Sequence, residues 1–256
     1  DDSVKIIKSK FPDVKIIENE TNLGYSRGFN KGIEYSIANG ADFILIMNND
    51  TVIDKNALNE LLKTIESDKK IGFVSGKVLD YDVPNQIQTL GRPSDNFTLI
   101  SDVHVGSGER DSNQYKSPME YDFIDDVFLL VRKEVIAEVG GYDDSFFLYY
   151  EETDWCSRVR KAGFRIICNP LAKIWHKGSL STGGGMNSVK RYWLSRNQYL
   201  FIMRNGNEFQ RLYFTIRNIL ITLPTLIISY SIKGRIDLLF SLIKGNVSGL
   251  IWTLKN

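Results

Sequence analysis

The chain has 256 residues, 43% hydrophobic and 25% charged, which is the composition of an ordinary globular protein with a sizeable core. Its 32 basic and 31 acidic residues are intermixed and give a net charge of +1, so charge offers no basis for nucleic-acid binding. The two cysteines, Cys156 and Cys168, form neither a disulfide framework nor a CxxC pair, which excludes a disulfide-rich scaffold and favours a reducing compartment.

The first predicted element is a short amphipathic helix over residues 4–11, followed by a strand at 14–17. A loop punctuated by glycines, residues 22–30, then enters a helix that continues to about Asn39, where Gly40 fits a helix stop. Because parallel α/β domains normally begin with a strand, we expect that a leading strand is missing ahead of this sequence.

The central part of the chain alternates strands and helices. We expect strands at 43–47, 71–78, 121–131 and 164–168, and helices at 55–67, 133–139 and 151–162. This alternation predicts an α/β domain with a mostly parallel central sheet. A long polar loop, 80–120, interrupts it, and loops of this length are usually functional or mobile. A second loop, 179–187, is rich in glycine and serine.

From residue 189 the chain becomes helical, with basic and aromatic residues. The apolar run 219–228 is shorter than the roughly 20 residues that a membrane span needs. Apolar and basic residues together suit helices that lie on a membrane or dock on a partner. Helices that simply fold back on the domain fit the pattern equally well.

One apolar run of strand length, 43–47, ends abruptly in Asn48, Asn49 and Asp50. Ligands of open α/β sheets gather at the carboxyl ends of the strands, and a carboxylate there suits a hard divalent cation that shares substrate phosphates. The alternative is a plain turn, in which Asp50 caps the following helix.

A second acidic cluster follows the aromatic run 146–150 and comprises Glu151, Glu152 and Asp154. Burial beside aromatic rings raises a carboxyl pKa and a helix N-terminus lowers it, so one glutamate here could remain ionised yet still accept a proton. The alternative is that these carboxylates only complement the helix dipole, with Asp154 paired to Arg158 one turn later.

His176 follows Trp175 at the junction of a strand and a loop, where a neutral imidazole can ligate a metal. A packed surface histidine is the alternative. His104 lies in the long polar loop and the sequence assigns it no role. The 22–30 loop offers glycines and a helix N-terminus to a phosphate, but it has no GxGxxG spacing.

The order of these motifs is more specific than any one of them. Residues 22–32, the strand ending at Asn48-Asn49-Asp50, residues 140–154 and residues 170–176 together resemble the family 2 glycosyltransferases. The resemblance is to the rhamnosyltransferase-like branch, which builds bacterial and archaeal surface polysaccharides. It extends to about residue 205 and leaves 206–256 as a separate helical, membrane-associating segment.

The resemblance implies a GT-A fold, a nucleotide-sugar donor such as dTDP-rhamnose or a UDP-sugar, an Mg²⁺ or Mn²⁺ ion, and inversion at the anomeric carbon. Asp50 matches the metal-binding carboxylate of the family's DxD motif, and Asn48 replaces the first aspartate. His176 matches a histidine that completes the metal site in several members. Glu152 falls on the catalytic base, with Glu151 and Asp154 at the acidic positions beside it.

Further positions match by the same resemblance. The donor-side residues are Asn22, Gly24, Arg27, Gly28, Asn30, Asn48 and Asn49, and the acceptor or loop residues are Trp175, Arg196 and Asn197. The Arg196-Asn197 pair recurs in the family, and its role stays open here. Two departures from the family are the longer glutamate at 152 and the absence of a counterpart to the first strand, whose acidic residue holds the nucleotide base.

The acceptor implied by this branch is a glycan or a lipid-linked sugar at the inner face of the cell membrane, which predicts a cytoplasmic, peripheral protein. Two rival functions remain open. One is a nucleotidyltransferase on a similar fold, although no basic, glycine-rich phosphate loop is present. The other is a non-catalytic glycan-binding or scaffold subunit whose C-terminal helices recruit partners.

Overall fold

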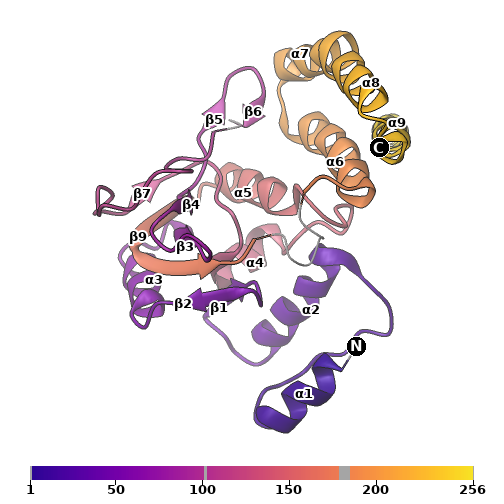
Figure 1. Ribbon diagram of the computed structural model, residues 1–256. Coiled ribbons are helices and arrows are strands. Elements are labelled where there is room, and N and C mark those ends of the chain that lie inside the picture. The colour runs from indigo at the N-terminus through magenta and orange to yellow at the C-terminus, as the bar shows by residue number, and fades with distance from the viewer. Residues whose placement is uncertain (1, 101–102, 179–184, 256) are drawn as a thin grey trace.

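A mixed sheet with helices on both faces forms the centre of the protein (Figure 1). The computed structural model describes residues 2–100, 103–178 and 185–255. The main path of the sheet is β1–β8–β3–β9–β2, with β4 on β3 and β7 on β9. The strands are β1 (Phe43–Met47), β2 (Thr51–Ile53), β3 (Ile71–Asp80), β4 (Ile87–Thr89), β7 (Met119–Glu120), β8 (Phe128–Arg132) and β9 (Arg165–His176).

The alternation of elements had predicted a mostly parallel sheet, but the sheet in the structure is mixed. In the described part of the chain, β3 and β9 run parallel, while the pairs β1–β8, β8–β3 and β9–β2 are antiparallel. The expectation is wrong because β8 inserts between β1 and β3 and runs against both. An alternating pattern predicts which segments are strands, but it does not determine their order in the sheet.

Helices cover both faces of the sheet and explain why β3 is buried along almost its whole length. Helix α3 (Ala57–Glu66) packs Leu61 and Ile65, one turn apart, against one face. Helices α2 (Gly24–Ala38), α4 (Lys133–Val139) and α5 (Glu151–Lys161) pack on the other face, around the fully buried Trp155. This second layer brings the start of α5 to the edge where β1 ends (Figure 1).

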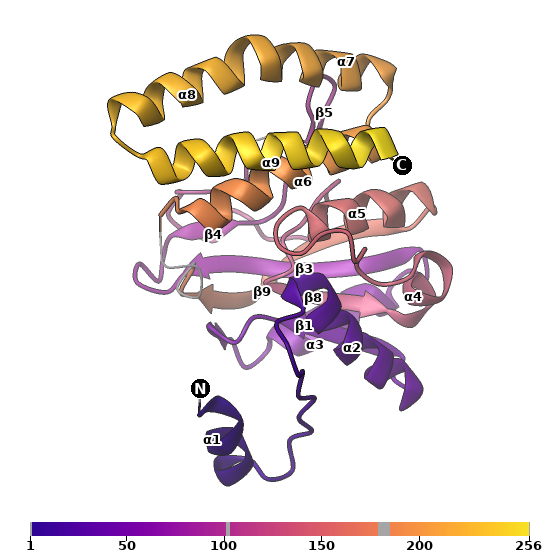
Figure 2. The same cartoon turned by 90° about the vertical axis from the view of Figure 1, so that its right-hand side faces the viewer.

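Two predicted strands differ from the structure. Residues 14–17 form no strand, and Val14 is exposed, because this segment and α1 (Ser3–Lys10) lie away from the sheet (Figure 2). The strand predicted at 121–131 is confined to β8, since residues 121–127 are irregular and make one isolated bridge, from Phe123 to Arg92. Apolar alternation alone cannot show that a segment has a neighbour with which to pair.

The long loop over residues 80–120 carries more structure than expected. It contains β4 and β7 and a small separate hairpin, β5 (Ser94–Asp95) and β6 (Leu99–Ile100). The buried ammonium group of Lys77 lies 2.8 Å from Asp111 and attaches this loop to the sheet. The predicted loop at 179–187 lies mostly outside the described residues.

The C-terminal helices form an outer layer beyond α5 (Figure 2). They are α6 (Ser188–Asn205), α7 (Glu208–Arg217), the π-helical turn η1 (Asn218–Thr222), α8 (Leu223–Ile232) and α9 (Ile236–Lys255). Two glycines of α9 allow it to approach α6 closely, since a Cβ on Gly245 would lie 2.5 Å from the carbonyl oxygen of Tyr192 and one on Gly249 would lie 2.8 Å from that of Arg196. The helices therefore pack onto the domain through α6.

Helices α7, η1 and α8 form one continuous helix, Glu208–Ile232. It is long and apolar enough to cross a membrane, and 11% of its most apolar window is buried. The apolar run 219–228 is by itself shorter than a span, as expected, but the helix that contains it extends beyond it at both ends. Length and composition fit a span and a helix lying on a surface equally well.

Candidate active site

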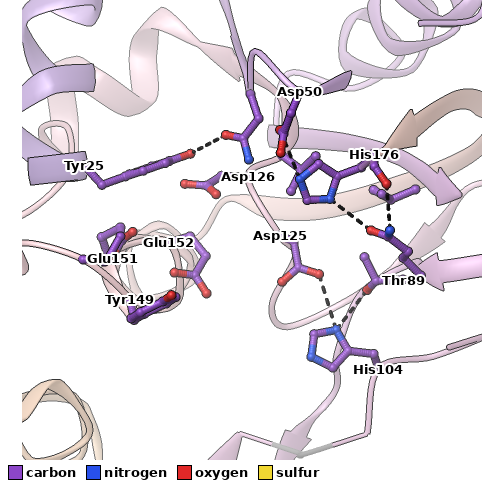
Figure 3. Close-up of a pocket in the computed structure, with 15 residues that line it drawn as sticks. Tyr25, Asp50, Thr89, His104, Asp125, Asp126, Tyr149, Glu151, Glu152 and His176 are labelled. Atoms are coloured by element: carbon purple, nitrogen blue, oxygen red, sulfur yellow. Dashed lines mark hydrogen bonds and ion pairs between the residues drawn. The ribbon is translucent and has the colours of Figure 1, made fainter. Parts of the chain in front are cut away.

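A cavity of about 390 Å³ opens at the sheet edge where β1 ends (Figure 3). Asp50, His176 and Glu152 all line it, although they come from three distant parts of the sequence. Figure 3 shows Asp50 and His176 together on one side and Glu151, Glu152 and Tyr149 on the other. We call these the strand wall, formed by Asp50 and His176, and the helix wall, formed by Leu148, Tyr149, Glu151 and Glu152.

Strand pairing builds the strand wall. Thr51 of β2 pairs with His176 of β9, and the amide of Lys177 donates to the carbonyl oxygen of Asp50 at 3.0 Å. This register brings the His176 Nε2 atom to 3.3 Å from the Asp50 carboxylate. Asp50 is not a helix cap, because β2 follows it and α3 begins only at Ala57.

The other ring nitrogen of His176 faces Gln88. Its Nδ1 atom lies 3.0 Å from the Gln88 Oε1 atom, and the Gln88 amide also donates to the His176 carbonyl oxygen at 2.9 Å. An amide oxygen only accepts, so Nδ1 carries the proton and donates to it. In the neutral form of the ring, the Nε2 atom, which faces Asp50 and the cavity, is then the nitrogen with a lone pair for a ligand.

Antiparallel pairing also brings two aspartates to this edge. Met47, the last residue of β1, pairs with Phe128, the first of β8, so residues just before β8 lie beside residues just after β1. Asp125 and Asp126 therefore line the cavity near Asn48. The sequence contained this signal, two acidic residues beside an apolar strand, but the predicted long strand at 121–131 concealed it.

Asp126 is buried and accepts a hydrogen bond from the Tyr142 hydroxyl at 2.6 Å. The Tyr25 hydroxyl donates instead to Asn48 Oδ1 at 3.3 Å. Burial, followed by the charge of Glu152, raises the pKa of Asp126 to about 7, and the hydrogen bond from Tyr142 opposes the shift. Asp126 is therefore a carboxyl group that can hold its proton close to neutral pH.

Glu151 is the more strongly perturbed of the two glutamates on the helix wall. It is 4% exposed, and its Oε2 atom has no hydrogen-bond partner within the described residues. Burial, followed by the charges of Glu152 and Asp126, raises the pKa of Glu151 well above its usual range. At this residue burial outweighs the effect of the helix N-terminus, so Glu151 favours its neutral form.

Glu152 has a different environment, because Arg92 faces it. The Arg92 Nη2 atom lies 3.3 Å from Glu152 Oε1 and 3.7 Å from Asp125 Oδ1, and His104 lies 3.4 Å from the other oxygen of Asp125. Burial lowers the pKa of Arg92, but the charges of Asp125 and Glu152 raise it more, so it stays above its ordinary value. The two acidic groups share one buried cation.

Arg92 and His104 are functional candidates that the sequence did not reveal, and His104 lines the cavity. Both lie in the loop between β4 and β7. Their place depends on the bridge between Arg92 and Phe123, and on a contact of 3.2 Å between His104 and Thr89. These are long-range pairings, and no local pattern encodes them.

Most of the residues matched to a donor loop do not line the cavity. From that segment Tyr25 lines the cavity, whereas Asn22, Gly24, Arg27, Gly28 and Asn30, and also Asn49 after β1, do not. The side chain of Asn30 brackets Tyr142, accepting from its amide at 2.9 Å and donating to its carbonyl oxygen at 2.8 Å. Arg27 forms an exposed ion pair with Asp144 at 3.3 Å.

Other matched residues are held by the protein itself. Asp154 is buried, pairs with Arg158 at 2.8 Å and accepts from Asn205 at 2.9 Å, as the structural alternative predicted. The Trp175 indole donates to the carbonyl oxygen of Pro84. The Arg196-Asn197 pair lies on α6, outside the cavity lining, and contacts the backbone of residues 145–149.

Sequence comparison finds relatives that act on sugars. The chain is 27% identical over 95% of its length to the dTDP-rhamnosyl transferase RfbF of Shigella flexneri, and covers 82% of that protein. It is 25% identical over 73% of its length to the low-salt glycan biosynthesis hexosyltransferase Agl10 of Haloferax volcanii. The chain spans only 60% of the length of Agl10.

Structural comparison shows the fold. A crystal structure of GalNAc-T7 with UDP, GalNAc and Mn²⁺ matches 84% of this chain and 45% of its own, with a TM-score of 0.53 and 14% identity. At this identity the match establishes a GT-A fold and nothing further. The model of glycosyl transferase family 2 matches residues 1–140, more than half of the chain. The chain belongs to the family 2 glycosyltransferases, as its motifs predicted.

Proposed function

We propose that this protein transfers a sugar from a nucleotide-sugar donor to an acceptor hydroxyl, with inversion and with the help of a divalent cation. The observation that carries the proposal is the convergence of Asp50, His176 and Glu152 on one cavity. The names of the relatives point to dTDP-rhamnose or another nucleotide-linked hexose as donor. The acceptor would be a glycan or a lipid-linked sugar.

The strand wall fits an Mg²⁺ or Mn²⁺ ion. Asp50 supplies a carboxylate oxygen and His176 a nitrogen lone pair, 3.3 Å apart. Among the described residues, no group of three or more His, Cys, Asp or Glu side chains forms a metal site. Two protein ligands are enough for a cation whose other positions are taken by water and substrate phosphates, where it would neutralise a leaving diphosphate.

The charge of the cavity supports the need for a cation. Five carboxyl groups line it, at positions 50, 125, 126, 151 and 152, and no lysine or arginine appears among the lining residues that the structure describes. Glu151 favours its neutral form and Arg92 offsets one charge, but the remaining carboxylates still repel a diphosphate, because like charges at close range raise the free energy of binding. A cation between Asp50 and the diphosphate would remove that repulsion.

Glu152 is our proposed base. It would accept the acceptor's hydroxyl proton as the acceptor oxygen bonds to the anomeric carbon and the bond to the diphosphate breaks. Glu152 has the Arg92 guanidinium group 3.3 Å from its carboxylate, whereas Glu151 favours its neutral form. General-base catalysis of this kind typically contributes about 10²–10⁴-fold to the rate.

Turnover with a donor panel tests the proposal. The protein would be incubated with UDP-, dTDP- and GDP-sugars and a lipid-linked sugar acceptor, and nucleotide release would be measured. We expect release with at least one donor, its loss after treatment with EDTA, and its return with Mn²⁺. Release that is indifferent to EDTA would contradict the role of the strand wall. A scaffold subunit would show no metal-linked release with any donor.

We also propose that the outer helices contact the inner face of the cell membrane. The helix 208–232 exposes apolar side chains, among them Leu220 and Ile228, and exposed basic residues Lys233 and Arg235 follow it. This pattern suits burial of an apolar face beside anionic headgroups. We expect the protein to float with vesicles containing phosphatidylglycerol and the double variant Leu220→Glu/Ile228→Glu to remain unbound. Equal flotation of both proteins would contradict the contact.

A further inference from the structure

The turn before α5 has an unusual backbone. Tyr149 and Tyr150 have φ angles of 67° and 72°, in the left-handed region that large side chains rarely adopt. The turn leads directly into Glu151 and Glu152, and Tyr149 itself lines the cavity (Figure 3). The conformation of this turn therefore determines where the two carboxyl groups lie.

Side chains and backbone from other elements hold the turn. Each backbone carbonyl oxygen from residue 145 to residue 150 accepts a hydrogen bond. The donors, in order, are Arg196 Nη1 at 2.9 Å, Ser26 Oγ, the Tyr25 amide at 2.8 Å, Asn197 Nδ2 at 2.9 Å for both residues 148 and 149, and the Asp154 amide at 2.9 Å. Helices α2 and α6 thus fix the turn from two sides.

Asn197 contributes most to this arrangement. It is fully buried, and its amide nitrogen donates to the carbonyl oxygens of both Leu148 and Tyr149. Its amide oxygen accepts from Arg196 at 2.6 Å. Because a guanidinium group can only donate, this contact fixes the orientation of the amide and directs both of its hydrogens to the strained turn.

We propose that Asn197 is a positioning residue, which holds the Tyr149–Tyr150 turn in its left-handed conformation and thereby places Glu152 for proton transfer. Arg196 contributes in two ways, by orienting the Asn197 amide and by its own hydrogen bond to the carbonyl oxygen of Ser145. The consequence for catalysis rests on the proposed function, whereas the holding of the turn does not. The Arg196-Asn197 pair thus links α6, on which the outer helices pack, to the helix wall.

Hydrogen exchange in the full-length protein, without donor, tests the holding of the turn. In Asn197→Leu, which keeps the number and branching of the side-chain heavy atoms and removes both donors, we expect the amides of residues 149–156 to exchange at least about tenfold faster. The matched control is Asn169→Leu. Asn169 is an equally buried amide that donates to Thr64 at 2.9 Å outside the cavity, and its loss should leave exchange at 149–156 unchanged.

Kinetics with the donor found by the panel test the effect on Glu152. We expect kcat of Asn197→Leu to fall about tenfold or more, with the donor KM within about threefold, because the strand wall is unaffected. Arg196→Gln should give a smaller increase in exchange at residues 149–156 and a smaller fall in kcat. If Asn197→Leu does not fold, the Arg196→Gln variant tests the proposal in its place.

Unchanged exchange at residues 149–156, or a fall in kcat that Asn169→Leu reproduces, would overturn the proposal. A parent protein that turns over no donor would instead refute the proposed function. The exchange experiment would still decide whether Asn197 holds the turn.

Discussion

The strand wall and the helix wall of the cavity are positioned by different kinds of interaction. Backbone pairing between β2 and β9 places Asp50 and His176. Side-chain hydrogen bonds to a strained turn and a cluster of buried charges place Glu151 and Glu152. The positions of Asp50 and His176 should therefore change little when neighbouring side chains are substituted. The positions of Glu151 and Glu152 should change whenever a side chain that holds the turn or balances their charge is removed.

The largest effect is expected from removing the proposed base. Glu152→Gln keeps the shape of the side chain and removes its ability to accept a proton, so we expect transfer to slow by about 10²–10⁴-fold. Binding of the nucleotide and Mn²⁺ should not change, because Glu152 lies on the wall opposite Asp50. Initial rates and calorimetry measure the two properties. A rate within threefold of the parent would show that another group takes the proton.

The next effect is expected at Arg92, whose guanidinium group lies 3.3 Å from Glu152. Arg92→Gln leaves the charges of Asp125 and Glu152 without their shared cation, and we expect kcat to fall about 10- to 100-fold through misplacement of Glu152. The matched control is Arg165→Gln, which removes two exposed ion pairs, to Asp68 and Glu120, away from the cavity. Exposed ion pairs contribute little, so this control should retain activity.

A glycine substitution tests the backbone that supports the strand wall. β9 shifts register opposite Gly76, where a Cβ would lie 2.3 Å from the carbonyl oxygen of Ala172. We expect Gly76→Ala to lower the free energy of unfolding by about 1–3 kcal/mol, as overpacking usually does. Gly32→Ala, in α2 with no atom within 4 Å of the new Cβ, should instead stabilise the protein by about 0.5–1 kcal/mol.

Denaturant unfolding of both variants measures this difference. Equal changes in the free energy of unfolding for the two variants would show that the shift in register imposes no close contact at Gly76. Some other interaction would then have to position His176.

The smallest effect concerns pH. Burial, followed by the charge of Glu152, raises the pKa of Asp126 to about 7, so between about pH 4 and 7 the folded state binds a proton that the unfolded state has released. Stability contributed by this proton is present at low pH and is lost as pH rises through 7. In Asp126→Asn that loss disappears. We expect the variant to gain on the order of 1 kcal/mol relative to the parent between pH 6 and 8, because one pKa unit corresponds to about 1.4 kcal/mol.

Unfolding by urea at several pH values measures the difference between the Asp126→Asn variant and the parent protein. A difference that is constant with pH would mean that Asp126 is already ionised at pH 5, and the charge balance described for the helix wall would then be wrong.

The sequence predicted that Asp50 lies at the sheet edge, because the signal for it is local. An apolar strand that ends in Asn48, Asn49 and Asp50 places a carboxylate at the sheet edge whatever the order of the strands. Glu151 and Glu152 were predicted for a similar reason, since a helix start follows an aromatic run. The alternative of a helix cap at Asp50 could be excluded only when the following β2 strand was seen.

The sequence could not predict the partners of these residues. Arg92 reaches Glu152 across 60 positions in sequence, and its place depends on a bridge to Phe123. The order of strands was also beyond the sequence, because the insertion of β8 between β1 and β3 depends on which edges pair best. The prediction of a strand at residues 14–17 was wrong for a related reason. These residues are typical of a strand, but no neighbouring strand pairs with them.

Calorimetry of UDP and dTDP binding, with and without Mn²⁺, tests the central claim most directly, because it separates the two walls. For the parent and Glu152→Gln, the account predicts nucleotide binding that requires Mn²⁺ and has the same affinity in both. For Asp50→Asn it predicts that the Mn²⁺-dependent binding is lost. Mn²⁺-dependent binding that survives in Asp50→Asn but disappears in Glu152→Gln would contradict the assignment of the cation to the strand wall.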